Sequence, residues 1–322
     1  FLGLLILVVV LVIGFVLLVL ARYDRTFEAP YPQITASTDS AIIARGRYLA
    51  MGPAHCGECH SSVSELSKVV AGGESSFSGG FAFELPIGKV YAANITSDEE
   101  TGLGKLTDQE IARSLRYGVR HDGKAIIDFM PFYDLSDSDL TAVISFLRTI
   151  KPIKNLVPPH EWNFMGKTVL AFLIEPSGDG DIPLVPPIDS TAAYGKYLAA
   201  SVANCRGCHT NRDMMTGAYI GTEYAGQTKM EVFDENGKIV RGKHLVTPNL
   251  TFDAETGRMS GWTQKDFIER FRKGKMIPGS PMPWGPFSRM SDLELTALYK
   301  FLTSLEPVAS AVPLGIQEGD PM

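Results

Sequence analysis

A five-residue motif, Cys-x-x-Cys-His, occurs twice in the 322-residue chain, at residues 56–60 and 205–209. In one helical turn, two thiols with this spacing can form thioether bonds to the two vinyl groups of one porphyrin, and the histidine that follows can ligate its iron. The chain has no other cysteine. The residues expected to hold two covalent c-type haems are Cys56, Cys59, Cys205 and Cys208 as attachment points, with His60 and His209 as proximal iron ligands.

Two other uses of paired cysteines compete with haem attachment. A structural zinc site takes four thiolates or a cysteine–histidine mixture, but each pair here lies inside its own complete repeat, far from the other. A disulfide framework suits small secreted domains, whereas 322 residues can form a core without one. Two haems explain the histidine after each pair, and the alternatives do not.

The sixth iron ligand decides between an electron carrier and an enzyme, because an open iron site permits chemistry on a substrate. Each repeat has a Met-Pro pair shortly before its last helix, Met130-Pro131 and Met282-Pro283. A thioether in a proline-stiffened loop is a neutral ligand that raises the reduction potential. We therefore expect Met130 and Met282 to be distal ligands, although a single such methionine is commonly core filler. His121 is the rival ligand for the first iron.

The two haem pockets are not expected to be identical. Trp262 stands in the second repeat where the first has Leu106. A buried indole N–H needs an acceptor, and a haem propionate is one candidate. Trp262 is therefore a predicted cofactor-binding residue, and the two reduction potentials are expected to differ.

The sequence around the motifs is also duplicated, which indicates a tandem repeat. Segments 45–50 and 195–199 share Gly-x-Tyr-Leu-Ala and are expected to be the helices that lead into each motif. A long loop follows each motif, and the second loop has a hairpin signal at residues 234–238. Two helices then follow in each repeat. Their expected capping boxes are Thr107/Glu110, Ser136/Asp139, Thr263/Asp266 and Ser291/Glu294, with Pro152 and Pro307 ending the last helices.

These patterns predict a mainly α fold, in which an N-terminal transmembrane helix is followed by two tandem class I-like cytochrome c domains. Each domain is expected to be all-helical with one long loop. The expected boundaries are 1–21 for the anchor, 22–41 for a tether, 42–152 for the first domain, 153–189 for a linker, 190–310 for the second domain and 311–322 for a tail.

Residues 1–21 contain no charged or polar side chain. As a helix they would measure about 31 Å, enough to cross a bilayer core. A cleaved signal peptide is the alternative, but residues 20–23 offer no clear Ala-x-Ala site. Arg22 and Arg25 alone would favour the opposite orientation. Because c-type haem is attached outside the cytoplasmic membrane, we expect one pass through that membrane with the haem domains on the periplasmic side.

Within the linker, residues 162–174 form an apolar segment too short to span a membrane. We expect it to pack against one or both haem domains, with contact to the bilayer surface as the alternative. The net charge of −6 and the absence of a basic run give no indication of nucleic-acid binding.

The motifs resemble the cytochrome c domains of multi-haem, membrane-associated cytochromes that serve bacterial alcohol and aldehyde dehydrogenases. The likeness covers nearly all of residues 42–306 and includes segments 88–102, 115–123 and 157–159 as well as both haem motifs. It implies other subunits of an electron-transfer complex as partners. The cytochrome subunits of that family commonly carry three haems, whereas this sequence has two motifs and an N-terminal apolar helix.

The sequence therefore predicts single-electron transfer from a membrane complex or periplasmic dehydrogenase to an oxidase, reaction centre or soluble carrier, with membrane lipid as a further partner. No general acid–base pair or nucleophile is visible, so no catalytic residue is predicted. Two alternatives stay open. One is a dihaem enzyme, such as a peroxidase or thiosulfate dehydrogenase, with a labile axial ligand. The other is a mainly structural subunit that docks a larger assembly.

Overall fold

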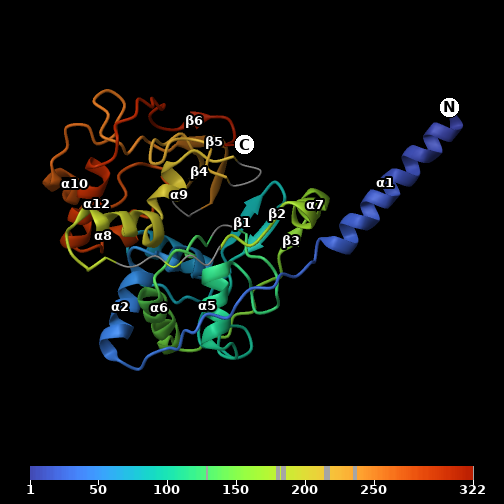
Figure 1. Ribbon diagram of the computed structural model, residues 1–322, viewed down its shortest axis with the longest axis horizontal. Coiled ribbons are helices and arrows are strands. Elements are labelled where there is room, and N and C mark those ends of the chain that lie inside the picture. Colours follow the sequence, from blue (N-terminus) through green and yellow to red (C-terminus); the bar gives the residue numbers. More distant parts are fainter. Residues whose placement is uncertain (128–129, 179–181, 183–185, 214–217, 235–237, 322) are drawn as a thin grey trace.

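The computed structural model describes residues 1–127, 130–178, 182, 186–213, 218–234 and 238–321, and these are mainly helical (Figure 1). The helices are α1 (Leu2–Arg22), α2 (Ser40–Met51), α3 (Cys56–His60), α4 (Leu66–Val70), α5 (Asp108–Tyr117), α6 (Asp137–Thr149), α7 (Phe164–Phe172), α8 (Ala192–Tyr197), α9 (Cys205–His209), α10 (Gln264–Arg272), α11 (Trp284–Phe287) and α12 (Asp292–Thr303). A 3-10 turn, η1 (Val63–Glu65), precedes α4, and a π-helical turn, η2 (Leu198–Val202), continues α8.

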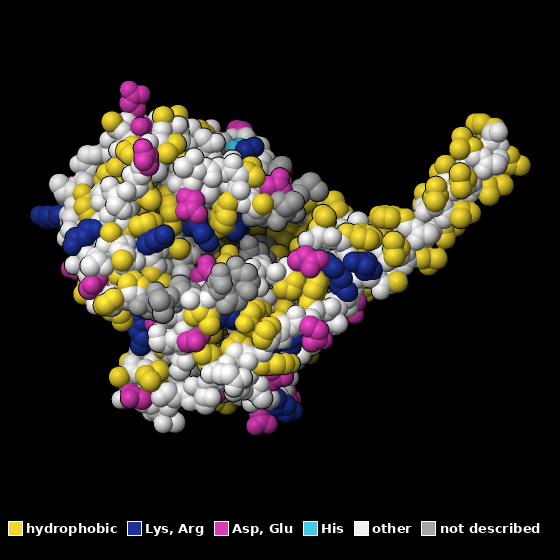
Figure 2. All heavy atoms as spheres, in the orientation of Figure 1, with side chains coloured by type: hydrophobic (Ala, Val, Ile, Leu, Met, Phe, Trp, Pro, Cys, Tyr) yellow, Lys and Arg dark blue, Asp and Glu magenta, His cyan; other side chains and the backbone are white. Residues whose placement is uncertain are grey.

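Helix α1 projects away from a body in which the two repeats lie against each other (Figure 1). Apart from Arg22 its side chains are apolar, almost all of them are exposed, and an 18-residue window within it has a mean hydropathy of 3.6. Among the described residues it is the one helix long and apolar enough to cross a membrane. Figure 2 shows this apolar surface along α1, with positively charged side chains gathered where α1 meets the body.

Close helix packing within each repeat explains why both lead-in helices have glycine at the same position. In the first half (residues 42–152), α2 packs on α6, and a Cβ on Gly46 would collide with the carbonyl oxygen of Ala142. In the second half (residues 190–310), α8 packs on α12, and a Cβ on Gly195 would collide with the carbonyl oxygen of Ala297. Glycine allows both helix pairs to approach backbone to backbone.

The predicted capping boxes are confirmed in three of the four helices. Those at the starts of α5, α10 and α12 are complete, with the side chains of both partners bonded to the backbone. In α6 only half of the box forms, because Ser136 accepts from the N–H of Asp139 but the Asp139 carboxylate is bonded elsewhere. Helices α6 and α12 end at Thr149 and Thr303, before the expected prolines.

The long loops contain strands, which corrects the expectation of all-helical domains. Strands β1 (Ala82–Leu85) and β2 (Gly88–Tyr91) pair in the first loop, and β3 (Glu161–Trp162) joins them from the linker. In the second loop, β4 (Lys229–Phe233) and β5 (Ile239–Val246) form the predicted hairpin, and β6 (Gln317–Glu318) pairs with β5. Residues 235–237 of the hairpin signal lie outside the described residues. Each sheet is antiparallel and lies beside its helices (Figure 1).

One asparagine in each half fastens the end of the long loop to the chain after the last helix. The Asn94 side chain donates to the carbonyl oxygen of Ile153 over 2.7 Å, and Asn249 donates to that of Val308 over 2.8 Å. Each asparagine oxygen also accepts from the threonine two residues later. The repeated Asn-x-Thr sequence therefore closes each half around its haem motif.

In each half, a tyrosine of the lead-in helix forms hydrogen bonds with the start of the last helix of the other half. The Tyr48 hydroxyl of α2 donates to Glu294 and accepts from the N–H of Ser291, the capping residue of α12. The Tyr197 hydroxyl of α8 donates to Asp139 over 2.8 Å and accepts from the N–H of the capping residue of α6 over 3.2 Å. Each half therefore caps the last helix of the other, and a single apolar core runs through both.

Candidate haem-attachment sites

Each Cys-x-x-Cys-His motif forms its own short helix, α3 or α9. The residue before the first cysteine, His55 or Asn204, has left-handed backbone angles, with φ of 39° and 46°. This sharp turn separates the motif from the lead-in helix and presents both cysteines on one helical turn. The two motifs, which have only the cysteines and histidine in common, therefore adopt the same local fold.

The thiols are poorly suited to act as thiolates. Burial raises the pKa of all four, and the pKa of Cys56, Cys59 and Cys205 rises to about 12. Zinc ligands and redox-active cysteines are thiolates, which an apolar environment disfavours. Within the described ranges, no group of three or more His, Cys, Asp or Glu side chains is placed to hold a metal ion. Burial of the thiols therefore disfavours the thiolate form that a zinc site would need.

The two histidines are held in the tautomer that an iron ligand requires. Nδ1 of His60 lies 2.7 Å from the carbonyl oxygen of Ala93, and Nδ1 of His209 lies 3.0 Å from that of Pro248. A carbonyl oxygen can only accept, so Nδ1 carries the proton and Nε2 keeps its lone pair. Burial lowers the pKa of both imidazoles, with the carbonyl contact working against it, so both rings are neutral at pH 7. A buried neutral imidazole with a fixed ring and a free Nε2 fits haem ligation.

A glycine after each motif completes this arrangement. The N–H of Gly79 donates to the carbonyl oxygen of His60, and that of Gly226 donates to that of His209, both over 2.8 Å. Both glycines have positive φ, and a Cβ on either would collide with the chain that carries the histidine's acceptor. The sequence did not reveal this pair, because the segments before them differ in length. The spacing to the following asparagine differs as well, since Gly79 lies 15 residues before Asn94 and Gly226 lies 23 residues before Asn249.

The Met-Pro pairs also share one backbone conformation. The N–H of Phe132 donates to the carbonyl oxygen of Met130 over 2.8 Å, and that of Trp284 donates to that of Met282 over 2.7 Å. Pro283 has φ −75° and ψ 61°, the values of an inverse γ-turn. Both methionines are partly buried against the core. The preceding residues of the first segment, 128 and 129, lie outside the described residues.

The other candidate ligands are placed less suitably. His121 is exposed in the turn after α5, which favours Met130 over it as the first distal ligand. Trp262 is half-buried and packs against the core, and its carbonyl oxygen accepts from the Tyr299 hydroxyl over 2.9 Å. Its contact with a haem propionate stays a prediction.

The two motifs differ in the charge they carry between the cysteines. Glu58 in the first is largely buried, which raises its pKa to about 8, although Lys275 of the second half works against the shift. Arg206 in the second motif lies 3.7 Å from Asp134, which follows Met130 in the first half. The two sites thus have different electrostatic surroundings, and each motif faces charge from the opposite half.

Contacts between the halves also surround the first motif. The His55 ring meets the Phe287 ring edge to face, with centroids 5.5 Å apart. The guanidinium of Arg289 donates to the carbonyl oxygen of Gly72. The first motif therefore lies next to the segment that follows Met282-Pro283, and the second motif lies next to the segment that follows Met130-Pro131. The sequence repeat could not reveal this, because both partners are remote in the chain.

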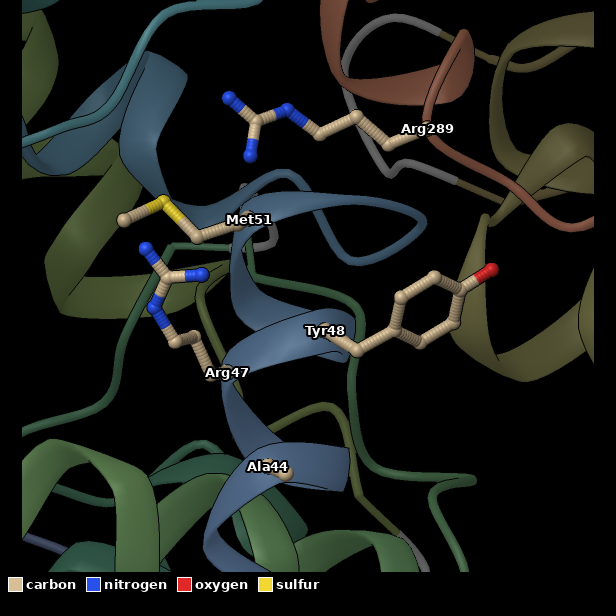
Figure 3. Close-up of a pocket in the computed structure, with 5 residues that line it drawn as sticks. All are labelled: Ala44, Arg47, Tyr48, Met51 and Arg289. Carbon is tan, nitrogen blue, oxygen red and sulfur yellow. The ribbon is translucent and has the colours of Figure 1, made fainter.

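A cavity of about 280 Å³ opens between the halves, lined by Ala44, Arg47, Tyr48, Met51 and Arg289 (Figure 3). Its two guanidinium groups are already engaged, Arg47 with Glu74 and Arg289 with the carbonyl oxygen of Gly72. The cavity follows from the way α2 meets the second half.

Comparison with known proteins agrees with these motifs. The chain is 27% identical over 315 residues to the cytochrome c subunit of alcohol dehydrogenase (quinone) from Gluconobacter oxydans (strain 621H), covering 91% of this chain and 60% of that protein. It is 29% identical over 287 residues to the gluconate 2-dehydrogenase cytochrome c subunit of Pantoea cypripedii, covering 83% and 60%. It is 26% identical over 310 residues to the fructose dehydrogenase cytochrome subunit of Gluconobacter japonicus, covering 88% and 56%.

No protein-family model matches the chain. The chain spans about 60% of the length of the relatives compared. The resemblance predicted from the motifs is confirmed: along most of its length, this chain is similar to the cytochrome c subunits of bacterial alcohol, fructose and gluconate dehydrogenases.

Proposed function

We propose that this chain is a membrane-anchored dihaem cytochrome c that transfers single electrons within a dehydrogenase complex. Each half (42–152 and 190–310) forms one class I-like cytochrome c domain around one haem. The residues that would hold the haems are Cys56 and Cys59 with axial ligands His60 and Met130, and Cys205 and Cys208 with axial ligands His209 and Met282.

The observation that carries this proposal is the duplication of one ligand geometry on two different sequences. In each half the Nδ1–H of a neutral imidazole donates to a backbone carbonyl oxygen, and a Met-Pro pair is held in the same tight turn. The haem supplies the one-electron chemistry when it is bound. The protein fixes and buries the imidazole and offers a soft thioether.

The relatives suggest the partners. Their names describe cytochrome subunits of alcohol, fructose and gluconate dehydrogenases, so we propose a dehydrogenase subunit as the electron donor. The acceptor would be an oxidase, a reaction centre or a soluble carrier. Helix α1 would cross the cytoplasmic membrane once and hold both domains on the periplasmic side, with residues 22–41 as tether, 153–189 as linker and 311–322 as tail.

Replacing either proposed methionine ligand with histidine should lower the midpoint potential of one haem and leave the other nearly unchanged. Imidazole stabilises the oxidised iron more than a thioether does, so the shift should be on the order of 0.1 V or more, within the range of about 0.8 V that axial ligands cover. Potentiometric titration of purified Met130→His and Met282→His proteins, followed by visible absorbance, measures this.

The matched control is Met276→His, which changes an exposed methionine six positions before Met282. It should leave both potentials unchanged. If Met282→His also left both potentials unchanged, Met282 would not be an axial ligand and the assignment of the second haem would be wrong.

A further inference from the structure

Helix α7, from the linker, lies beside the end of α1 that meets the body (Figure 1). The Phe15 ring of α1 contacts two rings of α7, with centroids 6.4 Å from Phe164 and 6.2 Å from Phe172. Arg22 adds a contact over the Phe172 ring. The linker segment therefore packs on the first half through β3, as expected, and also on the proposed membrane anchor.

Arginines just after the apolar stretch hold the two helices together. Nε of Arg22 donates to the carbonyl oxygen of Ala171 over 2.8 Å. Arg25 donates to the carbonyl oxygen of Ile174 over 2.6 Å and pairs with Glu175. The carbonyl of Ala171 lies in the last turn of α7 and that of Ile174 just past its end, where a helix leaves its acceptors unpaired and where cations are favoured. The contact is thus specific in geometry and fixes α7 against α1.

The position of Phe15 sets the depth of α7. Phe15 lies seven residues before Arg22, a distance of about 10 Å along a helix. If α1 spans the bilayer core, α7 lies alongside its last two turns, at the boundary between acyl chains and headgroups. Helices that lie flat in a membrane surface bury their apolar face about 5–10 Å deep at this boundary.

The surface of α7 suits that environment. Met165 and Leu173 are exposed by 51% and 49%, and Phe164 and Phe172 keep exposed area despite their contact with Phe15. Met165 and Phe172 are seven residues apart and so share a helix face. Lys167 is the one charged residue in the sequence of α7, and its ammonium lies 5.0 Å from the centre of the Tyr23 ring. A cation and aromatic rings beside an apolar face are typical of the membrane interface.

We infer that α7 inserts flat into the outer leaflet of the bilayer beside α1, and that lipid covers its exposed apolar face. The inference rests on the proposed anchoring by α1, because α7 continues the apolar surface of that helix. Helix α7 is also packed into the first half, where the Gly166 backbone abuts the carbonyl oxygen of Ile87 and β3 pairs with β2. The first half would therefore be held at a fixed orientation on the membrane.

Site-directed spin labelling of the full chain in phosphatidylcholine–phosphatidylglycerol nanodiscs tests this inference. The cysteine of the Met165→Cys variant can be labelled selectively with a nitroxide, because the natural cysteines are expected to be in thioether bonds. Its accessibility to oxygen relative to a water-soluble nickel chelate should be several-fold higher than that of a label at Met276→Cys, an exposed site far from α7 in the sequence. A label at Leu18→Cys reports the anchor itself.

The outcomes distinguish failure of the lipid contact by α7 from failure of the membrane anchoring by α1. An apolar signal at positions 165 and 18, with an aqueous signal at 276, supports lipid contact by α7. An aqueous signal at 165 with an apolar one at 18 overturns the inference and leaves the anchor intact. Low access to both reagents at 165 shows that protein covers the site and also overturns it. An aqueous signal at 18 means that the anchor proposal has failed, and the inference fails with it.

Discussion

Replacing Arg45 with alanine is expected to lower the free energy of unfolding by about 3–5 kcal/mol, because it leaves two buried carboxylates without their cation. Arg45 pairs with Asp139 over 3.0 Å and with Glu294 over 3.2 Å. The side chains of these carboxylates are only 7% and 3% exposed. One belongs to each half, so the Arg45 guanidinium links the two halves through its ion pairs.

The surroundings of Arg45 support this large effect. Burial alone would lower its pKa, but the hydrogen bond and charge of Asp139, with Tyr194 and Glu294, raise the pKa overall. Tyr194 also joins the cluster by accepting from Arg45 and donating to Glu294, each over 3.2 Å. The surrounding acceptors thus stabilise the charged form of Arg45, and the two buried carboxylates depend on that charge.

Arg47→Ala is the matched control, because Arg47 lies on the same helix and pairs with Glu74 at the surface. An exposed ion pair of this kind contributes about 0–1 kcal/mol. Denaturant unfolding of both variants, followed by haem absorbance, compares them. Equal losses for Arg45→Ala and Arg47→Ala would contradict the buried cluster as a main source of stability between the halves.

Removing the cysteine pair of either motif is expected to reduce the haem content from two to about one per chain, since each motif is complete within its own half. The variants are Cys56→Ala with Cys59→Ala, and Cys205→Ala with Cys208→Ala. The ligands of the remaining site are untouched in each case. Haem extraction as the pyridine haemochrome, related to protein mass, gives the ratio.

Arg206→Ala is the control for this experiment. It removes a side chain between the second pair of cysteines but keeps their spacing and the histidine. Its haem content should stay at two per chain. If a double cysteine variant kept two covalent haems, attachment at that motif would be disproved.

The sequence predicted the parts of the fold that depend on local signals. The helix starts followed from serine and threonine caps, and three capping boxes formed as expected. The fourth, at the start of α6, is incomplete for a tertiary reason. The shorter Asp139 carboxylate is taken by Arg45 and Tyr197, whereas Glu294 in the matching box reaches both its own cap and the other half.

The interface between the halves could not be predicted from one sequence. Tyr48 and Tyr197 belong to the predicted lead-in helices, but their acceptors lie on helices of the opposite half. The short strands were missed because β3 has two residues and pairs with a remote loop. The π-helical turn after α8 was also missed. The first half has Pro53 in that region, which cannot continue a helix, and the second has Val202.

The candidate site, too, was only partly predictable from the sequence. The motif cysteines, histidines and Met-Pro pairs are visible as repeats in the sequence. The carbonyl acceptors of Ala93 and Pro248 are backbone atoms, so no side-chain pattern marks them. They became recognisable only when the fold placed each long loop beside its motif.

The central claim is that the chain carries two low-spin haems, each with histidine and methionine ligands. The most direct test is to record optical spectra of the purified protein, oxidised and reduced, with and without carbon monoxide, together with the haem-to-protein ratio. The account predicts two haems per chain and reduced spectra that carbon monoxide does not change. A haem that binds carbon monoxide readily would show an open or labile iron site. It would contradict the assignment of one methionine and favour a dihaem enzyme over an electron carrier.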